Sequence, residues 1–258
     1  GGSESPATLC AQLAAEGFGK LAAAVGENLG TPEQKVYTGT VGQLAASRFE
    51  SLSVLLVEAA QVPSRRTQGL PDEAFARGKV PMTKQEVRAA VLAKLGVQPG
   101  ELLWDVGAGT GSVSVELALA APRGRVYAVE CDPEACALIR QNKEKFAVRN
   151  LTLVEGTAPA ALENLPAPDA VFIGGTKGNM AAVVEAALAR NPAARICISA
   201  IALETLSAAV AALTAHGLQA EVCQISVSRA KAAGKLHLLM ANNPIFLITR
   251  ADEAEKSV

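Results

Sequence analysis

Short apolar runs alternate with longer segments of mixed polarity from about residue 80 to the end of the chain. Five runs have the length and composition of buried strands, namely 102–106, 125–130, 151–155, 169–173 and 195–200. Helical segments lie between them, and this rhythm is typical of a parallel sheet with helices on both faces. The closing segments 220–228 and 236–249 predict an antiparallel pair at the edge. We therefore expect a seven-stranded, doubly wound α/β sheet with a C-terminal antiparallel hairpin.

A helix is expected just before the first of these strands. Thr83-Lys84-Gln85-Glu86 has the pattern of a capping box, in which the Thr83 hydroxyl and the Glu86 carboxylate satisfy backbone N–H groups at the helix start. The helical pattern then continues to Leu95. Thr83 is accordingly predicted to be the N-cap residue.

The first sixty residues follow a different pattern. It predicts two helices, 5–16 and 40–48, and three short strands at 21–25, 33–38 and 53–57. These elements form a half-sheet that is too small to bury a core of its own. We expect the chain to divide into a small partial α/β domain, a linker, a main domain and a tail, at 1–60, 61–68, 69–250 and 251–258.

The composition limits the classes of function. Half of the 258 residues are hydrophobic, 19% are charged and the net charge is −1, so neither a disordered chain nor a nucleic-acid-coating protein is expected. Only 3% are aromatic, which leaves few platforms for stacking nucleic-acid bases. The longest uncharged stretch, 205–220, is too short and too polar to cross a membrane. We expect a soluble protein without a nucleic-acid or membrane partner.

The cysteines and histidines argue against a metal site in the protein. There are two histidines, and none of the five cysteines belongs to a C-x-x-C pair. Several of the cysteines lie in apolar runs, where they are expected to be small core residues. This usage fits a reducing cytoplasm and predicts no protein-ligated metal.

A glycine-rich turn, Asp105-Val106-Gly107-Ala108-Gly109-Thr110-Gly111, joins the first main-domain strand to the helical segment 112–121. Glycine lets the backbone pass close to a ligand. Glu130 ends the next predicted strand, where a carboxylate can accept hydrogen bonds from ligand hydroxyls. The turn and Glu130 together predict a site for a nucleoside derivative, although an ordinary tight turn with an incidental acid is the alternative.

The glycine spacing distinguishes two such ligands. A dinucleotide fingerprint, G-x-G-x-x-G, needs its third glycine at position 112, where the chain has Ser112. The pattern D-x-G-x-G-x-G followed by an acid is instead typical of methyltransferases that use S-adenosylmethionine. Asp105 would shape the turn and contact the amino-acid end of this cofactor, and Glu130 would hold both ribose hydroxyls.

Several further segments make the pattern more specific. They are Gly69-Leu70-Pro71-Asp72 with Phe75, Val80-Pro81-Met82-Thr83-Lys84, Glu155-Gly156-Thr157-Ala158-Pro159, Pro168 to Gly175, Ala202-Leu203-Glu204-Thr205 and Asn243-Pro244. With the glycine turn, they resemble the decarboxylating precorrin methyltransferases of cobalamin biosynthesis over about residues 69–250. The resemblance implies a Rossmann-like enzyme that methylates ring carbon 15 of a precorrin and removes carbon dioxide from the ring C acetate. It also implies a homo-oligomer, because related enzymes form tetramers.

The first sixty residues resemble another protein. Gly26-Glu27-Asn28-Leu29-Gly30-Thr31-Pro32-Glu33 and the strand 52–57 are similar to the C-terminal end of the tetrapyrrole methylase that acts on ring carbon 5. That methylase is often fused ahead of the decarboxylating domain. The resemblance implies a bifunctional parent whose first activity this sequence would not perform alone.

The family resemblance also implies cofactor contacts, at Thr83, Gly107, Ala108, Gly109, Thr110, Gly111, Glu130 and Ala158. The Thr83 hydroxyl either caps the helix or reaches the cofactor carboxylate. A backbone N–H at Ala158 can bind the adenine edge, which a larger side chain would crowd. These positions and Asp105 form the predicted cofactor site.

Substrate contacts are less strongly indicated. The implied macrocycle carries many carboxylates, so we expect cations near the strand ends. Arg229 and Lys231 lie in the acid-free stretch 222–250 and, with Asn243, are the candidates, although a solvated basic hairpin would look the same. Lys177 is less specific, because charged residues often follow turns. Glu204, after the fifth strand, is the candidate for proton handling.

Two other functions remain possible from the sequence. One is a methyltransferase for a different acceptor, such as a protein carboxylate or an RNA, although an RNA substrate would favour an excess of basic residues that the chain lacks. The other is a non-catalytic module that binds the cofactor during assembly. Binding of S-adenosylmethionine without methylation or carbon dioxide release would favour the second.

Overall fold

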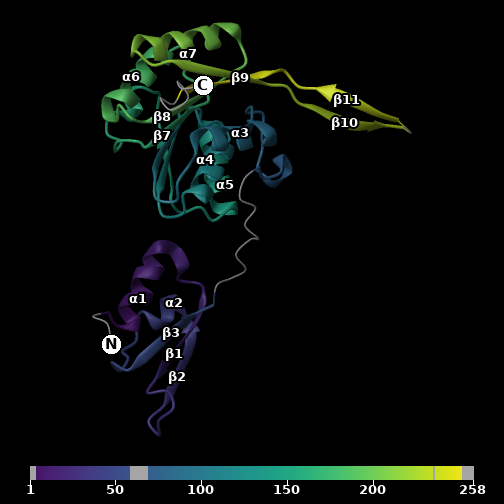
Figure 1. Cartoon of the computed structure of the whole chain (residues 1–258). Helices are drawn as coiled ribbons and strands as arrows, with labels where there is room; N and C mark the ends of the chain where they lie inside the picture. The colour runs from purple at the N-terminus through teal and green to yellow at the C-terminus, as the bar shows by residue number, and fades with distance from the viewer. Residues whose placement is uncertain (1–3, 59–68, 235, 252–258) are drawn as a thin grey trace, which may run out of the picture. The chain divides into compact units, whose positions relative to one another are not determined.

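The computed structural model describes residues 4–58, 69–234 and 236–251. The chain forms two compact units, Gly1–Arg65 and Arg66–Val258, and each is considered by itself (Figure 1). The expected linker 61–68 and residues 252–258 of the expected tail lie outside the described residues. Within the described part, no helix is both long and apolar enough to cross a membrane.

The larger unit contains the predicted seven-stranded sheet. Its strands are β4 (Leu102–Val106), β5 (Arg125–Glu130), β6 (Leu151–Glu155), β7 (Ala170–Ile173), β8 (Arg195–Ala200), β9 (Ala220–Ile225) and β12 (Ile245–Arg250). They lie in the order β6-β5-β4-β7-β8-β12-β9. The first five strands are parallel, and β12 pairs antiparallel with both β8 and β9. This confirms the fold class expected from the alternating apolar runs.

Helices cover both faces of this sheet (Figure 1). They are α3 (Gln85–Leu95), α4 (Ser112–Ala120), α5 (Pro133–Lys145), α6 (Met180–Arg190) and α7 (Leu203–Ala215). Successive strand side chains point to opposite faces, so Leu103 packs with α3, α4 and α5 while Trp104 and Val106 pack with α6 and α7. Burial on both faces explains why the parallel strands are apolar without interruption.

The strand order reverses beside β4. The chain passes from β4 to β5 on one side and returns to place β7 on the other. In open α/β sheets a ligand binds in the crevice outside the carboxyl ends of the strands at such a point. The glycine-rich turn after β4 and the Gly174-Gly175 turn after β7 both lie there.

The C-terminal strands differ from the prediction. The expected strands 220–228 and 236–249 each divide in two, which adds β10 (Ser228–Ala233) and β11 (Leu236–Ala241). These two pair only with each other, in a ribbon that extends away from the main sheet (Figure 1). Pro244 has no N–H to donate to a ladder, so the chain breaks at 242–244 and β12 starts afresh at Ile245.

The start of α3 also differs from the prediction. Its N-cap residue is Lys84, without a capping hydrogen bond from its own side chain, so the predicted capping box at Thr83 is wrong. The Asp72 carboxylate accepts a hydrogen bond from the Gln85 N–H at 2.9 Å instead. A residue distant in sequence therefore caps this helix, which leaves the Thr83 hydroxyl available for another role.

The smaller unit is a three-stranded sheet with two helices packed against it. The strands β1 (Ala22–Glu27), β2 (Lys35–Thr40) and β3 (Ser53–Val57) lie in the order β2-β1-β3, and all pairs are antiparallel. The helices are α1 (Pro6–Leu13) and α2 (Val41–Leu44), so the helix predicted at 40–48 is only one turn long. Five buried residues form the core of the unit: Cys10, Ala23, Val25, Val41 and Leu44. The expected small α/β unit is present, but the expectation that it is too small to bury a core of its own is wrong, because Cys10, Val25 and Val41 are fully buried.

Candidate active site

The carboxyl ends of the main-sheet strands surround a cavity of about 900 Å³. Its walls come from the glycine-rich turn, the segment 80–84 before α3, the ends of β5 and β7, and the start of α7. The loop 242–243 before β12 completes it. The cavity therefore lies at the point where the strand order reverses.

The glycine-rich turn is shaped for close approach. Gly107 and Gly109 have positive φ angles of 70° and 56°, which favour glycine. A Cβ atom at Gly107 would lie 2.3 Å from the Gly175 carbonyl oxygen, so no larger residue fits beside the β7 turn. Gly111 does not line the cavity; it is the N-cap of α4 and packs against Ile139. Its role is to start the helix behind the turn.

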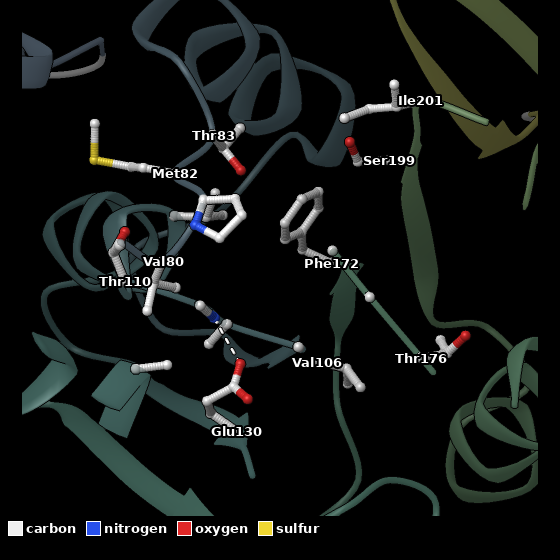
Figure 2. Close-up of a pocket in the computed structure, with 18 of the residues that line it drawn as sticks. Val80, Met82, Thr83, Val106, Thr110, Glu130, Phe172, Thr176, Ser199 and Ile201 are labelled. Atoms are coloured by element: carbon white, nitrogen blue, oxygen red, sulfur yellow. Dashed lines mark hydrogen bonds between the residues drawn. The ribbon is translucent and has the colours of Figure 1, made fainter. Parts of the chain in front are cut away.

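Glu130 lies beneath the turn with its carboxylate held in place (Figure 2). Its Oε2 accepts a hydrogen bond from the Gly109 N–H at 2.8 Å. Its Oε1 accepts from the N–H groups of Cys131 and Asp132, at 2.8 and 2.9 Å. The Cys131 thiol is a fourth, weaker donor to Oε1, at 3.7 Å, and a carboxylate has about four acceptor positions. One ribose hydroxyl would therefore replace the thiol, and a second would replace one of the backbone donors.

Asp105 is completely buried behind the turn and does not line the cavity. One of its oxygens, Oδ2, accepts a hydrogen bond from the Ser114 hydroxyl, and the other has no partner within the described residues. Burial, opposed by the Ser114 bond and reinforced by the charge of Glu130, raises the pKa of Asp105 to about 7. The Thr110 hydroxyl oxygen, at the cavity wall, is also buried and without a partner in the described structure.

An arginine that the sequence analysis did not identify organises the wall at 80–84. Arg88 of α3 has no exposed surface, and its guanidinium donates to Asp72 at 2.9 Å and to Glu116 at 2.7 Å. It also stacks over the Phe75 ring, 4.6 Å from the ring centre. Nothing in local sequence periodicity marks this residue, because its partners come from a loop and from another helix.

The same arginine fixes the backbone beside the cavity. Its two terminal nitrogens donate to the carbonyl oxygens of Thr83 and Leu70. The Glu116 carboxylate accepts from the N–H groups of Gly69 and Leu70, at 2.8 and 3.1 Å. These bonds tie the segment leading to Thr83 onto α3 and α4, so the position of Thr83 depends on a buried ion cluster.

Arg229 belongs to this cluster and not to the cavity lining. It donates to both oxygens of the Glu86 carboxylate, at 3.1 and 2.7 Å, and to Asp72 at 3.2 Å. The hydrogen bonds from Arg229 hold the pKa of Glu86 below its usual range. The guanidinium expected to bind substrate instead attaches the base of the ribbon to the start of α3.

The cavity has two chemically different halves. Near β4 and β5 it presents backbone groups, Glu130 and Asp132. Towards β7, β8 and β12 the lining is mostly apolar or uncharged, apart from Lys177 in the turn after β7. It includes Phe172, Ser199, Ile201, Thr205, Ile225, Val227, Asn242, Asn243 and Ile245. In Figure 2, Phe172 lies between Thr83 on one side and Thr176 on the other. The sequence analysis predicted only Asn243 in this second half.

The predicted residues therefore fall into two groups. Those that line the cavity are Thr83, Gly107, Ala108, Gly109, Thr110, Glu130, Ala158 and Asn243. Those that do not are Asp105, Gly111, Glu204, Arg229 and Lys231. Glu204 is exposed in the first turn of α7, whereas its neighbour Thr205 lines the cavity. The cavity lining thus includes seven of the nine cofactor candidates but only one of the three substrate candidates, Asn243.

Comparison with known proteins assigns this arrangement to a family. Residues 73–250 match the family model described as precorrin methyltransferase domain. A relative from Pyrobaculum calidifontis, named probable cobalt-precorrin-6B C(15)-methyltransferase (decarboxylating), is 47% identical over 71% of this chain and 95% of its own length. The chain belongs to the precorrin methyltransferase family. The resemblance stated from the sequence motifs is confirmed.

Two further comparisons show how far the likeness to this family extends. The chain is 40% identical to the precorrin-6Y C(5,15)-methyltransferase [decarboxylating] of a Sinorhizobium species, over 71% of this chain but only 45% of that protein. The crystal structure of a precorrin-6y C5,15-methyltransferase from Geobacter metallireducens matches with a TM-score of 0.69 and 40% identity. It covers 75% of this chain and 100% of that structure. Members of the family thus occur in chains of different length.

Proposed function

We propose that this protein methylates ring carbon 15 of a precorrin with S-adenosylmethionine and decarboxylates the acetate side chain of ring C. The observation that carries the proposal is the cavity at the point where the strand order reverses. One half of it is a cradle formed by the glycine-rich turn 107–110 and the carboxylate of Glu130, and the other half is mostly apolar. Relatives that match most of the larger unit are named for this reaction. The two halves of the cavity suit a nucleoside cofactor and a flat macrocycle.

The cradle fits S-adenosylmethionine in three respects. Gly107 leaves no room for a Cβ, so backbone atoms themselves form the surface that a ligand meets. A ribose hydroxyl can replace the Cys131 thiol, the weakest of the four donors to the Glu130 carboxylate. The unpartnered hydroxyl of Thr110 and the freed hydroxyl of Thr83 are available to the polar amino-acid end. The backbone N–H at Ala158 is assigned to the adenine edge.

Orientation is the main contribution that the protein makes to methyl transfer. S-adenosylmethionine supplies an already activated methyl group, so correct placement of the acceptor carbon is the principal requirement, worth up to roughly 7–11 kcal/mol. Arg88 serves this purpose by fixing the backbone of Thr83, and Phe172 offers an apolar surface against which a macrocycle can lie. Within the described lining, carboxylates occur only at the cofactor end.

The apolar half also suits decarboxylation. A carboxylate that leaves as carbon dioxide gives up its charge to the conjugated ring, and surroundings with few charges do not hold it back. Glu204 was the candidate for proton handling, but it is exposed outside the cavity. We therefore assign proton handling to hydroxyl groups of the lining, with Thr205 as the first candidate because it follows Glu204 and faces the cavity.

The ribbon of β10 and β11 is proposed as the surface for self-association. Four of its large apolar side chains are exposed, Leu236, Leu238, Leu239 and Met240, by 51–74%. An exposed apolar patch on a protruding ribbon marks an interaction site. A homo-oligomer, as in the tetramers that the family resemblance implies, would bury these side chains against a second copy.

The smaller unit is proposed to be the C-terminal part of a tetrapyrrole methylase for ring carbon 5. Its support is the Gly26 to Glu33 segment, which covers the end of β1 and most of the turn to β2, together with the half-sheet itself. One relative of the larger unit is named a C(5,15)-methyltransferase and is more than twice as long as the matched part. Methylation at ring carbon 5 is not assigned to this unit alone.

The test is incubation with S-adenosylmethionine and two candidate substrates, a metal-free and a cobalt-loaded precorrin-6B. Mass spectrometry is expected to show the gain of one methyl group and the loss of carbon dioxide with at least one of them. Tight cofactor binding with neither change in either substrate would contradict the proposal and favour the non-catalytic assembly module.

A further inference from the structure

Two cationic side chains line the cavity within the described residues, and neither was assigned a role above. Lys84 immediately precedes α3, and Lys177 lies in the turn between β7 and α6. The two lysines therefore reach the cavity from different elements of the fold, and the lining also includes the apolar side chain of Phe172.

The other cations near this wall are already engaged. Arg88 is fully buried among Asp72 and Glu116, and Arg229 is held by Glu86 and Asp72. By contrast, the described structure contains no ion pair of Lys84 or Lys177. Because a carboxylate elsewhere caps α3, the side chain of Lys84 has no structural task at the helix start.

Lys177 has an unusual backbone conformation. Its φ angle is +50°, in the left-handed region that residues other than glycine seldom adopt. The turn contains three glycines, at 174, 175 and 178. A glycine would adopt the backbone conformation at 177 without strain, but the residue there is a lysine. Strain of this kind clusters at ligand sites. A hydrogen bond with Cys131, reinforced by the nearby carboxylates of Glu130 and Asp132, raises the pKa of Lys177.

We propose that Lys84 and Lys177 bind two peripheral carboxylates of the tetrapyrrole substrate. The inference rests on the proposed function and adds the residues that select a polycarboxylated macrocycle. A flexible ammonium group suits carboxylates carried on mobile side chains. A salt bridge to the departing acetate would oppose its decarboxylation, so the two lysines hold carboxylates that remain in the product.

The test compares Lys84→Gln, Lys177→Gln and the charge-preserving Lys84→Arg with the wild type. Lys145→Gln is the control, because Lys145 is exposed at the end of α5, outside the cavity lining. The KM for the precorrin and the Kd for uroporphyrin, a fluorescent ring with eight carboxylates, report on substrate binding. Calorimetry with S-adenosylmethionine reports separately on the cofactor half.

Each Gln variant is expected to raise the precorrin KM and the uroporphyrin Kd by about tenfold, since a charged hydrogen bond is lost. The Kd for S-adenosylmethionine should stay within about twofold, and Lys84→Arg should recover most of the loss. Added salt should weaken uroporphyrin binding less in the Gln variants than in the wild type.

Unchanged KM and uroporphyrin Kd in both Gln variants would overturn the inference. A loss of S-adenosylmethionine affinity as large as the loss for uroporphyrin would also overturn it, because the lysines would then serve the cofactor carboxylate. A wild-type protein that binds S-adenosylmethionine but methylates no precorrin would contradict the proposed function instead. The uroporphyrin measurement would still decide the role of the lysines in that case.

Discussion

Protonation of the buried Asp105 affects the stability of the folded state. Its pKa is about 7 in the folded protein, against about 3.9 in an unfolded chain. The folded state therefore binds the Asp105 proton more tightly than the unfolded state does. This difference stabilises the fold fully below about pH 4, and the stabilisation is lost as the pH rises through 7. Asp105→Asn removes this dependence while keeping the size of the side chain.

We expect the wild type to lose about 2–3 kcal/mol of its free energy of unfolding between pH 5 and pH 8, compared with Asp105→Asn over the same range. The single tryptophan, Trp104, is buried beside Asp105 in β4, so its fluorescence during urea unfolding follows this unit alone. A difference that is constant with pH would contradict the raised pKa.

The variant Gly107→Ala tests whether the glycine-rich turn forms the cofactor site. Gly107→Ala places a Cβ 2.3 Å from the Gly175 oxygen and at a positive φ angle. We expect S-adenosylmethionine affinity to fall by more than about tenfold and the midpoint of unfolding to decrease, because the turn after β4 or the turn after β7 must move. Gly100→Ala is the matched control, since its added Cβ meets no atom within 4 Å. Equal affinity in the two variants would contradict the cradle.

The sequence placed Gly107, Gly109 and Glu130 in one site, and all three line the cavity, because glycine conformation and strand-end position depend on local sequence. Their cofactor role stays a prediction. Arg229 does not line the cavity, because its guanidinium binds Glu86 and Asp72, which only the folded chain brings close to it. A local pattern does not show which charges are already paired.

At the scale of elements, α3 depends on its buried ion cluster. Arg88→Met leaves Glu116 buried without its ion-pair partner and Asp72 with Arg229 alone, and breaking a buried pair in this way typically costs about 3–5 kcal/mol. Arg229→Gln removes bonds that are 40% exposed on the arginine side, so we expect no more than about 1 kcal/mol. Urea unfolding followed by Trp104 fluorescence measures both.

The same pair of variants tests the link between α3 and the cavity. Arg88→Met is also expected to weaken S-adenosylmethionine binding, because the carbonyl of Thr83 loses its donor. Arg229→Gln should leave this affinity nearly unchanged, since its bonds go to side chains and not to the cavity wall. The opposite ranking, in stability or in affinity, would show that the cluster does not position the wall.

The limits of prediction at this scale have physical causes. The five parallel strands were predicted closely because burial on both faces makes each a continuous apolar run. The capping box failed because Asp72, which lies 13 positions from Gln85, supplies the cap. The division of β9 from β10 was missed because both are extended, and only their pairing partners distinguish them.

At the scale of the whole molecule, the ribbon is expected to control self-association. Leu239 is 74% exposed on β11, and Leu239→Glu would place a charge in the proposed interface. We expect this variant to sediment as a smaller species than the wild type, with the same circular dichroism. Leu203→Glu is the control, because Leu203 is 68% exposed but lies on α7. A wild type that sediments as a monomer would contradict the proposed surface.

The central claim is that the turn after β4 and Glu130 form a site for S-adenosylmethionine. S-adenosylhomocysteine is what remains of S-adenosylmethionine after methyl transfer, and it does not react further. Isothermal titration calorimetry of the whole chain with this compound tests the claim without any substrate. The account predicts one molecule bound per chain, and a loss of at least about tenfold in affinity for Glu130→Ala. No heat with this ligand, or the same affinity in wild type and variant, would contradict it.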